Sequence, residues 1–180
     1  MAADYLVSSL QPLALGGPPP YTAEQFLDLC RGQLTAKDAE AVAAVMADTP
    51  SSHPLVSRWR DLDAQLRNTI AAERARLRGQ DAARWRRPVE GCSLFWTNRA
   101  AAAFQEKDPA RRERLLDQLR WDAAGELVPP AAPLSTAAVF AYAIRLAVVL
   151  RRAARDAAAG NEVFNRLTAA TKIEFKESHS

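Results

Sequence analysis

The chain has 180 residues, enough for one domain of ordinary size with a substantial core. Apolar residues make up 48% and charged residues 25%, the balance of a soluble globular protein, and the net charge of +3 names no partner by itself. The first residues lack the basic and apolar pattern of a signal peptide. Cys30 and Cys92 form no CxxC pair, so we expect both to be reduced and buried in a cytoplasmic protein.

The first twenty residues predict a partly extended segment ahead of the helices. An apolar run over Tyr5–Leu15 is broken by Pro12, so it is either extended or a single helical turn. Residues 16–20, GGPPP, form a rigid connector because consecutive prolines hold an extended backbone. Thr22–Gln25 is a capping box, and it opens a short helix that ends near Gly32.

Further helices begin at capping and proline signals. We expect one from Thr35 through Met46 and others over about Pro54–Arg78, Gly91–Glu106 and Pro109–Leu127. In the helix from Pro54, the apolar residues recur mostly every three or four positions, which predicts packing in an antiparallel pair. The residues expected to be buried in the helix from Pro109 are Leu115, Leu116, Leu119, Ala123 and Leu127.

The stretch Ser135–Gly160 predicts the central helix of the fold. Ser135 or Thr136 can cap its start, and Gly160 supplies the usual stop. One apolar face includes Leu146, and a second, opposite face includes Ile144. A helix with two apolar faces needs neighbours on both sides. Arg145 leaves apolar runs far shorter than the roughly 20 residues of a membrane span, which excludes that alternative.

These patterns predict an all-α fold, a single-domain bundle of about six or seven helices over residues 1–180. After Gly160, Asn161 is expected to cap a short closing helix, and residues 172–180 are expected to form a frayed tail.

The sequence has few residues or motifs that could support catalysis. His53 lies in a turn and His179 in the tail, and the chain has no HExxH, GxSxG or glycine-rich phosphate loop. We expect His53 to be solvated, because no base or orienting partner is evident. Glu113 and Asp117 are expected to be exposed ion-pair partners on a helix. The sequence therefore predicts no enzyme, no catalytic residue, no cofactor and no metal site.

A basic stretch from Arg67 to Arg87 is the main candidate for an interaction. Its seven arginines and two acids leave a net charge of +5, more than the +3 of the whole chain. Its arginines could bind nucleic acid, an acidic protein surface or anionic lipid headgroups. The other interpretation is that the stretch is only a solvated helix face. Trp85 could stack on a base, but no nucleic-acid motif is present.

Trp121 is a second candidate, because it lies about 200° from the apolar stripe of its helix. We favour burial against a second neighbour in the bundle over an exposed, partner-binding tryptophan. Arg120 could cover its edge or pair with Asp117. The candidate interaction residues are Arg74, Arg76, Arg78, Arg84, Trp85, Arg86, Arg87, Arg120 and Trp121.

Several segments resemble a family. They are YLVSSLQPL at residues 5–13 with EQFLDLC at 24–30, RERLLDQLRW at 112–121, FAYAIRL at 140–146 and the GNEVF ending at 160–164. These resemble the blocks of an uncharacterised bacterial family that is associated with V/A-type ATPase gene clusters. The chain departs from it in Arg145, where the family pattern has lysine.

The resemblance implies a non-enzymatic accessory subunit or assembly factor of a V/A-type rotary ATPase, similar in role to the helical C subunit. Its partners would be proteins such as the stalk subunits, and it would lie in the cytoplasm, peripheral to the membrane through the complex. The alternative is that the chain is a basic helical nucleic-acid-binding or regulatory protein that uses the Arg67–Arg87 stretch.

Overall fold

The computed structural model describes residues 2–89, 91 and 93–177, and within them the protein is all-helical, with seven α-helices, one short 3-10 helix and no strand. This confirms the predicted fold class. The elements are α1 (Ala2–Ser9), α2 (Ala23–Gln33), α3 (Ala36–Met46), α4 (Pro54–Leu77), η1 (Ala83–Trp85), α5 (Leu94–Ala103), α6 (Pro109–Gly125) and α7 (Thr136–Glu177).

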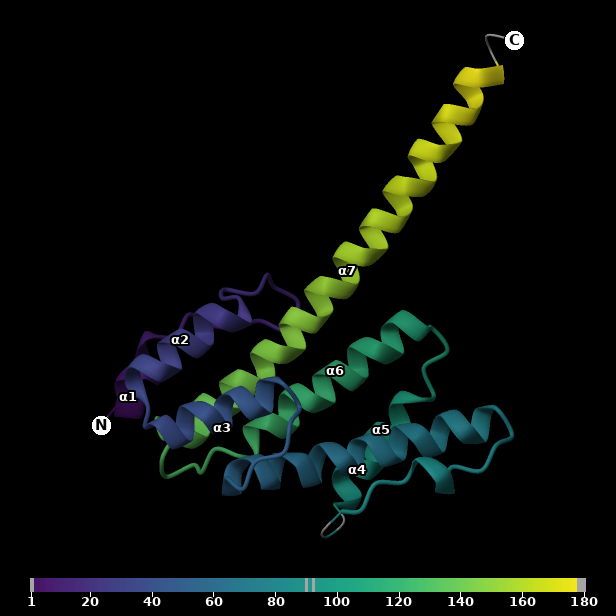
Figure 1. Ribbon diagram of the computed structural model, residues 1–180. Helices are drawn as coiled ribbons and strands as arrows, with labels where there is room; N and C mark the ends of the chain where they lie inside the picture. Colours follow the sequence, from purple (N-terminus) through teal and green to yellow (C-terminus); the bar gives the residue numbers. More distant parts are fainter. Residues whose placement is uncertain (1, 90, 92, 178–180) are drawn as a thin grey trace.

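Helix α7 is the centre of the bundle (Figure 1). It packs against α1, α2, α3 and α6, while α4 packs against α3, α5 and α6. Both predicted apolar faces of α7 are buried: Leu146 is 0% exposed on one, and Phe140 and Ile144 are 0% and 3% exposed on the other. The two-faced pattern therefore correctly indicated neighbours on both sides.

The end of α7 differs from the prediction. Gly160 does not stop the helix, which continues to Glu177, so no separate helix begins at Asn161. Glycine ends a helix by adopting a positive φ, but it also tolerates helical φ, at a cost of about 1 kcal/mol relative to alanine. Residues 172–177 of the expected tail are helical, and 178–180 lie outside the described residues. In Figure 1 the second half of α7 projects away from the other helices.

Other boundaries follow the capping signals closely. Thr22 forms the predicted capping box with Gln25, and Gly79 ends α4 with a φ of +64°. The segment Tyr5–Leu15 is neither extended nor a single turn at its start, because α1 covers Ala2–Ser9 and buries Leu6 at 1% exposure.

Some individual burial predictions are wrong. Leu115 of α6 is 45% exposed, whereas Leu116 and Leu119 are 2% and 4% exposed, so the buried side of α6 does not include Leu115. Cys30 is a buried free thiol, as expected, and burial raises its pKa to about 12. Cys92 lies outside the described residues. In the described part of the chain, no helix combines the length and apolar character needed to cross a bilayer.

Candidate functional site

A cavity of about 590 Å³ lies between α4, α6, α7 and the loop that follows α4. Helix α4 forms one wall, α6 and α7 form the opposite wall, and the loop contributes Trp85 and Arg87. The described residues that line it include the arginines Arg67, Arg74, Arg78, Arg87, Arg120 and Arg151, together with Glu113, Gln80, Trp85 and the apolar Ile70, Ala71, Ala75 and Leu116. We call this cavity the arginine cavity.

The loop runs back along α4 and is hydrogen-bonded to side chains of that helix. The carboxamide of Asn68 donates to the carbonyl of Arg87 at 2.9 Å and accepts from its amide at 2.8 Å. Farther along, the amide of Ser93 donates to Gln65 Oε1 at 2.7 Å. These contacts return the chain over α4 after the turn at Gly79 and place Arg87 beside the cavity.

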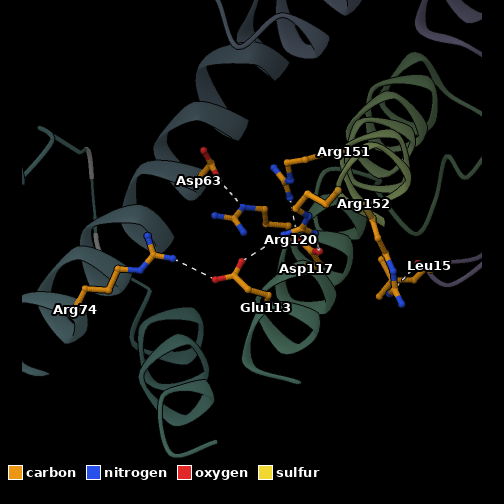
Figure 2. Close-up of polar contacts among 9 residues, drawn as sticks. Leu15, Asp63, Arg74, Glu113, Asp117, Arg120, Arg151 and Arg152 are labelled. Atoms are coloured by element: carbon orange, nitrogen blue, oxygen red, sulfur yellow. Dashed lines mark hydrogen bonds and ion pairs between the residues drawn. The ribbon is translucent and has the colours of Figure 1, made fainter. Parts of the chain in front are cut away.

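Asp63 is a buried carboxylate at one side of the arginine cavity, with 6% of the residue exposed. It pairs with Arg67 on α4, and Arg120 of α6 donates to it at 3.4 Å (Figure 2). Burial alone would lower the pKa of Arg67, but Asp63 and Asp48 outweigh it and the pKa is raised. Burial lowers the pKa of Arg120 from its ordinary value, although Asp63 opposes the shift.

Asp117 is the second buried carboxylate, and it joins α6 to α7. Only 1% of the residue is exposed, and Arg151 Nη2 donates to it at 2.8 Å, with Arg155 as a second partner. The prediction of an exposed Asp117 is therefore wrong, because its face of α6 lies against α7. Glu113 is half-exposed, and it pairs with Arg74 at 3.2 Å and Arg155 at 3.5 Å (Figure 2).

The charges of the arginine cavity are not all balanced. Arg67, Arg74, Arg120 and Arg151 each pair with a carboxylate. Neither Arg78 nor Arg87 has a carboxylate partner among the described residues, and both are exposed. The cavity thus combines excess positive charge with the edge of a tryptophan, which is an arrangement that favours anions.

Comparison with known proteins gives one family. Residues 93–175, a little under half of the chain, match the model of a family described as "Protein of unknown function (DUF2764)". Neither the curated proteins nor the solved structures give a match. The similar region covers α5, α6 and most of α7, so it includes the α6 and α7 wall of the arginine cavity.

The structure separates the sequence-predicted candidates into two groups. The ones that line the arginine cavity are Arg74, Arg78, Trp85, Arg87 and Arg120. The others are Arg76, Arg84, Arg86 and Trp121, which do not line it. Arg76 pairs with Glu73 at 2.9 Å, and the guanidinium of Arg84 lies 4.6 Å from the centre of the Trp85 ring.

Trp121 has the neighbour that we expected, since it is half-buried against α7. The guanidinium of Arg145 lies 5.1 Å from the centre of its ring, and Arg145 Nε donates to the carbonyl of Trp121 at 3.1 Å. Arg120 pairs with Asp63 of α4, whereas the sequence suggested Asp117. Trp121 therefore belongs to the packing of α6 on α7.

Sequence reasoning missed the contribution of α7 to the site. Arg151 and Arg155 are one turn apart, and so are their partners Glu113 and Asp117 on α6. Two carboxylates and two arginines, each four residues apart on consecutive helices, are a signal that could have indicated this interface.

His53 is not a solvated loop residue as predicted. Its side chain is 12% exposed, its Nδ1 accepts from the amide of Leu55 at 3.2 Å, and its ring stacks on Phe140 with centroids 4.9 Å apart. His53 thus caps α4, and Nε2 lies 3.1 Å from Asp38. Within the described residues, no group of three or more His, Cys, Asp or Glu side chains is arranged to hold a metal ion.

Proposed function

We propose that the protein is a non-enzymatic accessory subunit or assembly factor of a bacterial V/A-type rotary ATPase, with a role similar to that of the helical C subunit. The observation that carries the proposal is the projecting half of α7 (Figure 1). In proteins, most helical stability comes from packing of an apolar face rather than from intrinsic propensity. A helix that leaves a bundle in this way is suited to pair with a helix of another subunit.

The anchoring of α7 supports a structural role. Its first half is buried on two faces, and buried Asp117 pairs with Arg151 and Arg155 near the point where the helix leaves the bundle. A projecting helix that is fixed at its base can transmit force, because close-packed interiors are only weakly compressible.

The segments that carry the family resemblance lie close together in the fold. The block at residues 112–121 is part of α6, the block at 140–146 is part of α7, and the block at 5–13 begins in α1. Helices α1 and α6 both pack against α7. These three blocks therefore lie in helices at the base of α7, whereas the block at 160–164 lies in its projecting half.

The test is a pull-down of reconstituted ATPase stalk subunits with the purified protein. We expect retention of a stalk subunit by the full chain and its loss when the chain ends at Ala159. The matched control is Lys107→Gln, a single charge change on the exposed loop between α5 and α6, which should leave retention unchanged. If the full chain retains no stalk subunit, the proposal is wrong.

The arginine cavity favours a second candidate, a nucleic-acid-binding or regulatory protein. Arginines would contact phosphates, and Trp85 would stack on a base. A gel shift with random DNA and RNA at physiological salt tests it, and charge reversal at Arg84, Arg86 and Arg87 should abolish the shift. Affinity should then fall with salt at a log–log slope of about −0.7 per phosphate contact on single strands.

A further inference from the structure

The least exposed arginines of the arginine cavity are held in place by carboxylates. Arg120 has only 16% of its side chain exposed and is held by Asp63 at 3.4 Å, so its guanidinium is fixed. Arg67 shares Asp63 and also pairs with Asp48 at 2.8 Å. Because these carboxylates neutralise Arg67 and Arg120, the excess positive charge of the cavity lies on Arg78 and Arg87.

Arg74 can take part in binding an anion without leaving a carboxylate unpaired. It pairs with Glu113 at 3.2 Å, and both side chains are about half-exposed, so the pair is weak. Glu113 also has Arg155 as a partner at 3.5 Å, and would keep it if Arg74 turned toward a ligand. Arg78 and Arg87 have no carboxylate partner among the described residues.

Apart from the charged residues and Gln80, the residues that line the cavity are apolar or aromatic. Ile70, Ala75 and Leu116 line it and are each less than 9% exposed, and Trp85 is 39% exposed beside them. An inorganic anion would leave this surface unused. A ligand with oxyanions at one end and a planar ring at the other would use both parts, since aromatic rings stack on nucleobases.

We propose that the arginine cavity binds a mononucleotide, a nucleoside mono- or diphosphate, with its phosphates on Arg74, Arg78 and Arg87 and its base against Trp85. The volume of about 590 Å³ lies within the roughly 300–1,000 Å³ range of small-molecule sites. Helices α4, α6 and α7 and the loop line a half-open hollow, and its limited volume suits a single nucleotide better than a strand. The proposal goes beyond the ATPase role and does not depend on it.

The experiment is isothermal titration of the full chain with AMP and ADP, with adenosine and inorganic phosphate as separate arms. We expect micromolar binding of at least one nucleotide, and at least about tenfold weaker binding of adenosine and of phosphate alone. The double variant Arg78→Gln/Arg87→Gln should weaken nucleotide binding by at least about tenfold. Trp85→Ala should weaken nucleotide binding and leave phosphate binding unchanged.

Arg86→Gln is the matched control, because Arg86 is exposed, adjacent to Arg87 and outside the cavity lining. It should bind nucleotide like the wild type, and circular dichroism should show that every variant remains folded. The proposal is overturned if neither nucleotide binds up to about 1 mM, or if Arg86→Gln weakens binding as much as the double variant. Tight binding of a ten-nucleotide strand without binding of mononucleotides would overturn it in favour of nucleic acid.

Discussion

Replacing Asp117 by asparagine tests whether one buried carboxylate joins α6 to α7. The substitution keeps the shape and removes the charge that pairs with Arg151 and Arg155. A hydrogen bond to a charged group contributes about 1.5–3 kcal/mol, but both arginines are nearly half-exposed and regain hydration when released. We therefore expect the free energy of unfolding to fall by about 2–3 kcal/mol, which is near the smallest contribution that two hydrogen bonds to a charged group would make.

The loss should be measured by urea denaturation followed by circular dichroism. For a chain of this size it corresponds to a fall of roughly 4–12 °C in Tm. Glu113→Gln is the matched control, one turn away on the same helix and also paired with Arg155, but half-exposed, so it should cost less than about 1 kcal/mol. Equal losses in the two variants, or a loss below about 1 kcal/mol in Asp117→Asn, would refute the reasoning.

Four further outcomes are expected. Ile144→Ala should cost about 2–5 kcal/mol in urea denaturation, because the side chain is 3% exposed on the second apolar face; a nearly neutral result would contradict two-faced packing. Asn68→Ala should speed tryptic cleavage after Arg86 with little change in Tm, since it frees the loop alone and the Arg87–Pro88 bond itself resists trypsin; unchanged cleavage would contradict the role of Asn68 in holding the loop. In a Cys92→Ser background, Cys30 should resist iodoacetamide at pH 8, and rapid labelling would contradict its burial. The pKa of the Cys30 thiol is about 12 in the folded protein and 9.0 at its ordinary value, so as pH rises the unfolded chain loses the thiol proton first. The free energy of unfolding should therefore fall between pH 9 and 12, and it should fall more steeply than in Cys30→Ala.

The sequence predicted the helices well where local signals decide them. Capping residues and prolines act within one turn, so Thr22, Pro54 and Pro109 marked helix starts that the structure confirms. Gly160 failed as a stop signal because a helix end depends on the residues after the glycine as well as on the glycine itself.

The site was only partly predictable. The charge of the Arg67–Arg87 stretch was visible, but its fold-back depends on Asn68, which contacts Arg87 across 19 residues. The contribution of Arg151 depends on how α6 packs against α7; the four-residue spacing of the charged pairs can indicate that interface, but it does not give its geometry. The balance of charge could not be predicted either, since it requires knowing which carboxylates lie within reach.

The continuous course of α7 makes it a lever. At 1.5 Å per residue, the segment from 158 to 177 extends about 30 Å beyond its anchored base. A tilt of about 5° at the base would therefore move the tip by roughly 2.6 Å, a distance that changes which side chains can touch on a partner. Small rearrangements between α6 and α7 therefore produce larger displacements at the far end of the helix. Gly160 has the weakest helical preference of the residues in that segment, so bending of the helix would begin there.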